Sequence, residues 1–418
     1  MNILLLSPWL PWPPFGGSLI RTFETLSYLS RKNRITLLAP LRYPEEAEHV
    51  PTLNRLCVNV ITTALSDETQ AVLRRLAIGL LRGRALIQSM HYDRHLARQI
   101  QRLTSQEVYD IIHVESSFMS PYLAFVSPRS RAKKVLSMHN IESVRFAREL
   151  KFARGARRLA LLSDYIIFKS WERKSLRQFD GILAVSASER EWIRRHAPAA
   201  PVELVPNGVD SQYFSVADES PPNRSIVFTA LMNYPPNIDA ALWFCREILP
   251  IIQSKHPEMS FKIVGDKPGP MIRAVEQRKG VLVTGRVPDI RPYLVDSLAL
   301  VVPLRSGGGT RLKILEAMAM GRPVVSTYEG AEGLEVTDGV DILLADTPEE
   351  FATHIFSLVA DPQLGKRLGL AGRNLVETKY DWSICLRRVD NFYQRLLGHL
   401  PAAPDFFELR PPCKLSLQ

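Results

Sequence analysis

The sequence predicts an α/β fold in which two doubly wound domains face a central cleft. Three observations lead to this prediction. Short β-rich runs alternate with segments of helical periodicity, and the alternation starts again after Ser215–Ser225. The chain has 418 residues, which exceeds the size at which one hydrophobic core stops growing. Ligands of such sheets bind outside the carboxyl ends of the strands, so we expect a cleft between the two domains.

In the first half of the chain, most of the predicted strands are separated by helical segments. Strands connected in this way pair in parallel, and helices cover both faces of their sheet. The predicted strands are Asn2–Ser7, Arg34–Pro40, Cys57–Thr63, Tyr109–Glu115, Lys133–His139 and Gly181–Ser186.

The second half repeats the pattern, so both domains are expected to be Rossmann-like. We place the domains at residues 1–205 and 206–380, with the boundary near Pro206–Ser220. A helix in residues 381–400 is expected to pack back on the first domain, and the proline-containing residues 401–418 form a loose tail. The predicted strands of the second domain are Ser225–Ala230, Ser260–Val264, Val281–Thr284, Leu298–Pro303, Pro323–Ser326 and Asp341–Ala345.

Composition argues against several classes of protein. The four cysteines lie far apart without C-x-x-C spacing, so neither a metal knuckle nor a redox pair is expected. Residues 1–20 carry no charged side chain, but four prolines and two glycines interrupt any helix there. We therefore expect no signal peptide, no membrane span and a cytoplasmic location.

The formal net charge of +10 indicates a polyanionic partner, and the charge is concentrated in one segment. Residues 144–178 contain ten Lys or Arg against three acidic residues, with apolar residues such as Phe146 and Leu159 between them. Such a helical surface could dock on the anionic inner face of a membrane, or it could be a solvated helix face. No nucleic-acid partner is expected.

A glycine-rich loop between a strand and a helix is the strongest signal of a ligand site. Gly307, Gly308 and Gly309 precede Thr310-Arg-Leu-Lys313, and such a loop lets backbone amides approach a phosphate at a helix N-terminus. Arg311 and Lys313 would add positive charge for a diphosphate, and Glu316 could accept hydrogen bonds from ribose hydroxyls. The alternative is an ordinary turn with a surface Lys313–Glu316 pair.

The motif set resembles that of the retaining glycosyltransferases of family four, also called group 1, over most of residues 1–397. These enzymes have the GT-B fold of two facing Rossmann-like domains. The subgroup that it resembles has a Gly-Gly-Gly-Thr-Arg-Leu-Lys stretch. The motifs that carry the resemblance are Gly16-Gly17, Val205-Pro-Asn-Gly-Val-Asp210, Val283-Thr-Gly-Arg-Val-Pro-Asp289, the segment from Gly307 to Gly321, Pro323-Val-Val-Ser-Thr327 and Gly330-Ala-Glu-Gly-Leu334.

The resemblance implies roles for individual residues. His139 would face the donor sugar, Glu316 would hold the donor ribose, and Arg311 and Lys313 would neutralise the diphosphate. The remaining donor contacts would come from Gly16, Gly17, Gly285, Arg286, Val287, Gly307, Gly308, Gly309 and Thr310.

The sequence departs from the family pattern at two places. Gly308 stands where many members have the first glutamate of a Glu-x7-Glu motif. Residues 230–237 lack the Arg and Lys that clamp the diphosphate in typical members, which leaves that task to Arg311 and Lys313.

The expected reaction is metal-independent transfer of a sugar from a UDP-, GDP- or ADP-sugar to a glycan or lipid-linked acceptor, with retained configuration and no cofactor. A dinucleotide-dependent oxidoreductase would need Gly-x-Gly-x-x-Gly after the first strand, and Phe15-Gly-Gly-Ser-Leu-Ile-Arg21 lacks that spacing. A sugar-nucleotide-binding protein without turnover and a nucleotide-sugar epimerase on the same fold are the remaining alternatives.

Overall fold

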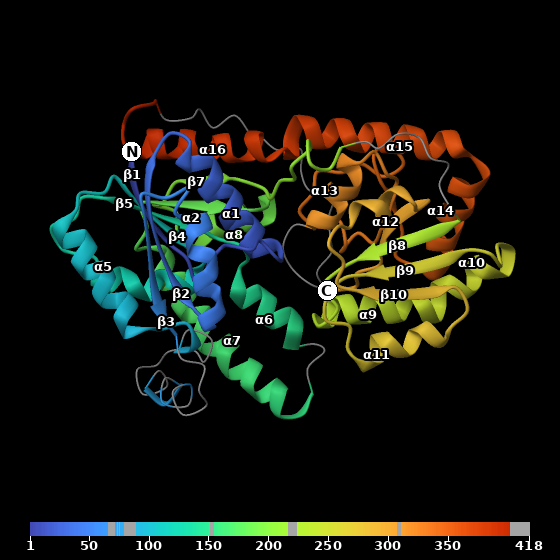
Figure 1. The fold of residues 1–418 in the computed structure, drawn as a ribbon, viewed down its shortest axis with the longest axis horizontal. Helices are drawn as coiled ribbons and strands as arrows, with labels where there is room; N and C mark the ends of the chain where they lie inside the picture. The colour runs from blue at the N-terminus through green and yellow to red at the C-terminus, as the bar shows by residue number, and fades with distance from the viewer. Residues whose placement is uncertain are drawn as a thin grey trace.

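The computed structural model describes residues 1–65, 72, 74, 76–78, 89–150, 154–215, 224–306 and 311–401. Two parallel sheets, each with its own helices, lie side by side in Figure 1. We call the part of the chain around the first sheet the N-terminal unit and the part around the second sheet the C-terminal unit. In the described part of the chain, no helix is both long enough and apolar enough to cross a membrane.

The N-terminal unit contains a seven-stranded parallel sheet of order β3-β2-β1-β4-β5-β6-β7. The central strands β1 and β4 are almost completely buried because helices cover both faces of the sheet. The six predicted strands are confirmed, and the short β7 was missed because only three residues pair. The strands are β1 (Asn2–Leu6), β2 (Arg34–Leu41), β3 (Asn59–Ala64), β4 (Ile111–Glu115), β5 (Lys133–Ser137), β6 (Gly181–Ala184) and β7 (Val202–Leu204).

The helices of this unit connect its parallel strands. They are α1 (Gly17–Ser30), η1 (Pro44–His49), α2 (Val50–Leu53), α5 (Arg94–Gln106), η2 (Ser117–Phe125), α6 (Glu142–Leu150), α7 (Gly155–Leu176) and α8 (Ala187–His196). Helices α6 and α7 pack on each other below the sheet in the view of Figure 1.

The C-terminal unit contains a six-stranded parallel sheet of order β10-β9-β8-β11-β12-β13. All six predicted strands are confirmed, although the last is only two residues long. The strands are β8 (Ser225–Thr229), β9 (Ser260–Val264), β10 (Val281–Gly285), β11 (Ala299–Val302), β12 (Val324–Ser326) and β13 (Leu343–Leu344). The expected fold class, two doubly wound α/β units, is therefore confirmed.

The helices of the second half cover this sheet and then return toward the first. They are α9 (Pro235–Trp243), η3 (Phe244–Ile248), α10 (Leu249–Lys255), α11 (Pro270–Arg273), η4 (Ala274–Gln277), α12 (Arg291–Val295), α13 (Leu312–Ala319), α14 (Pro348–Ala360), α15 (Pro362–Leu375), η5 (Val376–Tyr380) and α16 (Trp382–Leu396).

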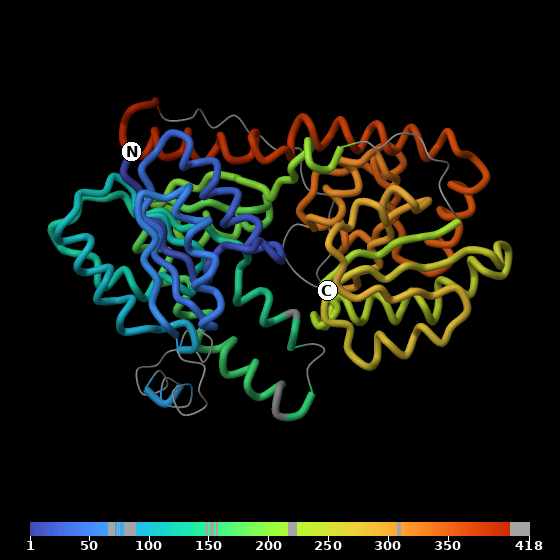
Figure 2. The backbone as a smooth tube through the Cα atoms, viewed as in Figure 1, coloured from blue at the N-terminus to red at the C-terminus, as the bar shows by residue number. Residues whose placement is uncertain are grey.

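The chain passes between the two units twice, and the two crossings touch. Val209 pairs with Asp381, and the Val209 amide donates to the Tyr380 carbonyl at 2.8 Å. Helix α16 then packs on α1 and β7, and its apolar residues Cys385, Leu386 and Val389 join the core under the first sheet. Figure 2 shows this red helix running back along the N-terminal unit.

Candidate active site

The N-termini of two helices lie next to each other where the units meet. Gly16 caps α1 with φ 91°, a left-handed value that a glycine adopts without strain. A Cβ on Gly17 would lie 3.7 Å from Leu312 Cδ1 at the start of α13. Free N–H groups and the helix dipoles make both ends attractive to an anion, so a phosphate group between them would meet positive potential from both sides.

Helix α13 places two cations at this point. Arg311 is its N-cap residue, and its side chain is buried. Half-buried Lys313 lies 3.4 Å from Asn237 Oδ1 and stands 4.3 Å from the centre of the Phe228 ring. Burial, followed by repulsion from Arg311, lowers the pKa of the Lys313 ammonium to about 7. An anionic ligand would restore its charge.

Glu316 lies one turn further along α13 and is half-buried. Burial raises the pKa of its carboxyl to about 7, although the nearby Lys313 ammonium lowers that pKa in part. Lys313 and Glu316 are therefore not the exposed surface pair that the simple-turn alternative requires. A carboxylate that is partly shielded from water and close to a cation is suited to binding polar hydroxyls.

The loop after β8 lacks the Arg and Lys that clamp the diphosphate in typical family members. It supplies neutral groups instead. Asn237 is buried, and its amide donates to the Leu231 carbonyl at 2.9 Å, which leaves its oxygen directed to Lys313. Burial raises the pKa of Tyr234. The charge of Arg311 lowers that pKa, and the charge of Glu149 in α6 raises it.

His139 follows β5 and is held by a buried carboxylate. Its Nε2 lies 2.5 Å from Glu115 Oε2, and its side chain is 8% exposed. Glu115 Oε1 lies 2.8 Å from His113 Nε2, and His113 Nδ1 in turn meets the Tyr393 hydroxyl of α16. Sequence reasoning found His139 but missed Glu115, His113 and Tyr393.

Arg21 and Glu189 were also missed; Arg21 is buried near this network, and Glu189 is half-buried. Arg21 Nη1 donates to Asn207 Oδ1 at 2.8 Å, and burial lowers the pKa of its guanidinium. Burial raises the pKa of Glu189 to about 8. Within the described residues, Arg21 Nε and Glu189 Oε2 are buried without a hydrogen-bond partner. The signal for Arg21 in the sequence was a lone arginine inside an amphipathic helix after Gly16-Gly17.

The segment after β10 reaches across to the N-terminal unit. Gly285 has φ 74°, and the guanidinium of exposed Arg286 lies 4.4 Å from the centre of the Phe15 ring. Val287 is half-buried against the core of the C-terminal unit. A flat cation stacked on an aromatic ring is attractive at this distance. This contact joins the two units.

The structure places five of the residues predicted for the site around the start of α13. Gly16 and Gly17 meet the start of α13, and Arg311, Lys313 and Glu316 lie in and beside its first turns. Gly307, Gly308, Gly309 and Thr310 lie outside the described residues. Over the described ranges, no three His, Cys, Asp or Glu side chains are grouped to hold a metal ion.

Comparison with known proteins agrees with this architecture. A model of glycosyltransferase family four matches residues 15–213, and a model of the group 1 glycosyl transferases matches residues 223–361. The two matches cover the two units in turn.

Three similar proteins illustrate the range of the likeness. An uncharacterised 44.6 kDa protein in the cps region of Klebsiella pneumoniae is 20% identical over 399 residues, which cover 91% of this chain and 96% of that protein. The GDP-mannose-dependent α-(1-6)-phosphatidylinositol monomannoside mannosyltransferase of Mycolicibacterium smegmatis is 24% identical over 328 residues. These residues cover 68% of this chain and 84% of that protein.

Among solved structures, HepE of Anabaena in complex with UDP and glucose superimposes with a TM-score of 0.65 at 16% identity, over 94% of this chain and 99% of HepE. At this identity, the structural likeness establishes the fold alone. The two family models match the sequence itself, and together they span both units. The chain belongs to the group 1, family four glycosyltransferases and has their GT-B fold.

Proposed function

We propose that this glycosyltransferase moves a sugar from a nucleotide diphosphate donor to a glycan or lipid-linked acceptor, with retained configuration, in polysaccharide or glycolipid biosynthesis. The observation that carries the proposal is the meeting of the α1 and α13 N-termini beside Arg311 and Lys313. This arrangement suits a diphosphate, which is the leaving group of such a transfer.

The two cations replace the missing clamp after β8. When the bond between the anomeric carbon and the diphosphate breaks, negative charge develops on the diphosphate. Arg311 and Lys313 would balance that charge together with the backbone amides of Gly307–Thr310 and Gly16–Gly17. Because fixed positive charge is present at this point, we propose that transfer needs no divalent metal.

The remaining residues would hold the rest of the donor. Glu316 would accept hydrogen bonds from the ribose hydroxyls, and the backbone of Gly285, Arg286 and Val287 would contact the base. His139, at the carboxyl edge of the first sheet, would contact the donor sugar. The acceptor would then enter from the α6 side of the cleft and attack on the face that the diphosphate leaves.

The names of the similar proteins support this choice of substrates. HepE binds UDP and glucose, and the mycobacterial relative uses GDP-mannose and a phosphatidylinositol mannoside. The Klebsiella relative is encoded in a cps region. We therefore extend to this chain a nucleotide-sugar donor and an acceptor that carries a glycan or a lipid.

The test is release of nucleotide diphosphate by the purified protein from UDP-, GDP- and ADP-sugars, with and without membrane extract and with and without EDTA. The Lys313→Ala variant should lose the release, whereas Lys279→Ala, which removes an exposed lysine from the same unit, should keep it. Release that requires extract and survives EDTA supports a metal-independent transferase.

Other outcomes contradict the proposal. Release without any acceptor, with the donor sugar recovered in altered configuration, would indicate a nucleotide-sugar epimerase. Binding of one nucleotide sugar without turnover would indicate a sugar-nucleotide-binding protein. Release that disappears with EDTA would overturn metal independence but keep the transferase.

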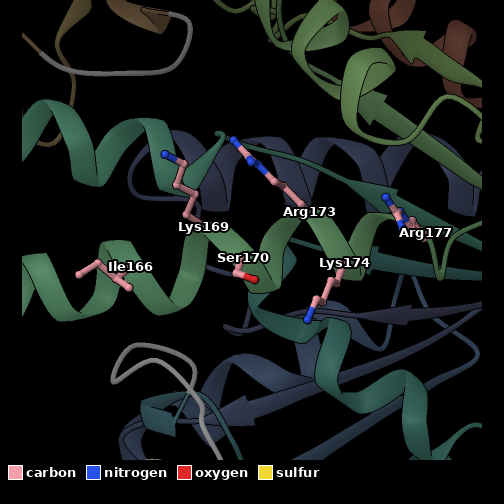
Figure 3. Close-up of a pocket in the computed structure, with 6 residues that line it drawn as sticks. All are labelled: Ile166, Lys169, Ser170, Arg173, Lys174 and Arg177. Atoms are coloured by element: carbon pink, nitrogen blue, oxygen red, sulfur yellow. The ribbon is translucent and has the colours of Figure 1, made fainter.

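We also propose a partner for the basic segment, and the exposure and pairing of its side chains favour one face of α7 as the contact surface. Arg145 pairs with Glu142 and Glu149, and Phe146 is buried, so α6 is not the lipid-facing surface that the sequence suggested. On α7, Leu159, Leu162 and Ile166 are exposed. Residues of the same helical stripe toward its C-terminus line a shallow depression: Lys169, Ser170, Arg173, Lys174 and Arg177 (Figure 3).

We propose that this α7 stripe binds an anionic membrane surface. Within the described part of the chain, no ion pair engages Arg173, Lys174 or Arg177. Exposed apolar side chains followed by uncompensated cations match the boundary between acyl chains and acidic headgroups. Binding there would place the cleft close to a lipid-linked acceptor.

Sedimentation with vesicles tests this surface. The triple variant Arg173→Gln, Lys174→Gln, Arg177→Gln should bind vesicles of phosphatidylcholine and phosphatidylglycerol on the order of 100-fold more weakly, since each basic residue contributes about 1 kcal/mol. Arg94→Gln, Arg98→Gln, Arg102→Gln removes the same charge from the exposed face of α5 and should bind nearly as the parent does. Equal losses in the two variants would mean that only net charge matters.

A further inference from the structure

A chain of buried polar groups joins the C-terminal helix to His139. His113 and Glu115 both belong to β4, His139 follows β5, and Tyr393 lies on α16. The contacts run from the Tyr393 hydroxyl to His113 Nδ1, from His113 Nε2 to Glu115 Oε1 at 2.8 Å, and from Glu115 Oε2 to His139 Nε2 at 2.5 Å. His113, Glu115 and Tyr393 are completely buried.

The carboxylate at the centre fixes which atoms carry protons. Burial alone would raise the pKa of Glu115, but the two neighbouring histidines outweigh it and hold that pKa well below its usual range. An ionised carboxylate only accepts hydrogen bonds, so Nε2 of His113 and Nε2 of His139 must both donate. Burial raises the pKa of Tyr393, so its hydroxyl keeps its proton and donates to His113 Nδ1.

The assignment leaves one ring nitrogen for a ligand. With Nε2–H of His139 committed to Glu115, Nδ1 of the neutral ring carries the lone pair. Within the described residues, this Nδ1 is buried and has no hydrogen-bond partner. A buried acceptor without a partner costs free energy, and a bound hydroxyl would remove that cost.

We infer that Glu115, supported by His113 and Tyr393, is a positioning residue that fixes His139 as its Nε2–H tautomer and directs Nδ1 to a hydroxyl of the donor sugar. The inference rests on the proposed function, because that function places the donor sugar at His139. It adds a link from α16 to the proposed position of the donor sugar.

The tautomers can be observed without any substrate. Protein labelled with ¹⁵N-histidine, studied at a pH where neutral imidazoles dominate, should show the Nε2–H tautomer for both rings, with signals assigned by His139→Gln and His113→Gln. In Glu115→Gln the amide can accept from only one ring and donates to the other, so one of the two rings should change tautomer. A wild-type His139 that carries its proton on Nδ1 overturns the inference.

The kinetic arm uses the donor identified by the release assay. Glu115→Gln should lower kcat by about tenfold or more, as expected for loss of one oriented hydrogen bond at the reacting sugar. The KM for the donor should change much less, because the diphosphate contacts are intact. Tyr393→Phe, which keeps the core volume, should also lower kcat, but by less than Glu115→Gln does.

Tyr122→Phe is the matched control, because it also deletes a buried hydroxyl, which contacts the His91 carbonyl and the Asp93 amide. It should change neither the tautomers nor kcat. Equal kcat losses in Tyr122→Phe and Tyr393→Phe would reduce the network to a structural role. The expected tautomers in a protein that releases no nucleotide from any donor would defeat the proposed function alone, whereas an active enzyme with the opposite tautomer would defeat only this inference.

Discussion

Lys313 and Glu316, which belong to the proposed donor site, are partly buried at the expense of stability. Both are half-buried, and burial brings the pKa of each to about 7 from opposite directions. For Lys313 the folded pKa lies below the ordinary value of 10.5, so the unfolded chain binds the proton more tightly. The buried amine therefore destabilises the fold in full below pH 7, and its cost disappears as the pH rises toward 10.5.

Lys313→Met should accordingly stabilise the free protein at mildly acidic pH. We expect its melting temperature at about pH 6 to exceed that of the parent by about 2–4 °C, with a smaller gap at alkaline pH. If the proposed donor site is correct, the nucleoside diphosphate of the donor should raise the melting temperature of the parent, and the variant should lose that rise. Lys279→Met, at an exposed position, should leave both quantities unchanged. A Lys313→Met protein that melts below the parent at this pH would contradict the argument.

At the scale of elements, one carboxylate joins α6 to α7, the helix proposed to face a membrane. Glu172 of α7 accepts from the amides of Glu142 and Ser143 at 2.9 and 3.2 Å and from the Ser143 hydroxyl at 2.6 Å. These amides open α6, so Glu172 acts as a cap supplied by a neighbouring helix. Burial raises the pKa of Glu172 to about 7.

Glu172→Ala should loosen α6 without disturbing the rest of the unit. Loss of the cap and of two buried amide partners should lower the free energy of unfolding by about 2 kcal/mol. Hydrogen exchange followed by mass spectrometry should become faster in residues 142–150 and remain unchanged in α1. Glu191→Ala, which breaks an exposed pair with Arg195, is the control and should cost less than about 0.5 kcal/mol. Unchanged exchange in α6 would show that α6 holds its position without this cap.

For the whole molecule, the two chain crossings fix how the units are joined. A Cβ on Gly208 would lie 2.8 Å from the Tyr380 carbonyl oxygen and 2.9 Å from the Trp382 ring, so the crossings approach as closely as glycine permits. Trp382 begins α16 and packs into the core of the N-terminal unit. A change at the crossing therefore acts on that unit through α16.

Gly208→Val should separate the crossings and reduce the cooperativity of unfolding. We expect overpacking to lower the free energy of unfolding by about 1–3 kcal/mol. A separate unfolding transition should appear at lower temperature, because α16 leaves the first sheet. Differential scanning calorimetry would detect it. Gly269→Val is the matched control, because nothing lies within 4 Å of a Cβ at that glycine. If both variants melt as the parent does, the crossing is not a point of constraint.

Much of the fold could be predicted from the sequence because strands buried on both faces are continuous apolar runs. The twelve predicted strands all formed, within a few residues at their ends. Strand β7 was missed because Val202–Leu204 is too short for its pattern to stand out. The glycine-rich loop and the helix after it predict Arg311, Lys313 and Glu316 as donor-site residues. Such a prediction can be made from the sequence because a phosphate site at a helix N-terminus is local in the chain.

The sequence by itself determined the two α/β units, their family and the residues whose roles depend on neighbours in the chain. Only the tertiary structure decided which distant groups meet: Tyr393 with His113, Glu115 with His139, and Gly17 with Leu312. It also removed Arg145 and Phe146 from the expected lipid surface. The physical reason is that the protonation of a buried group depends on its partners in space, and these come from strands and helices far apart in the chain.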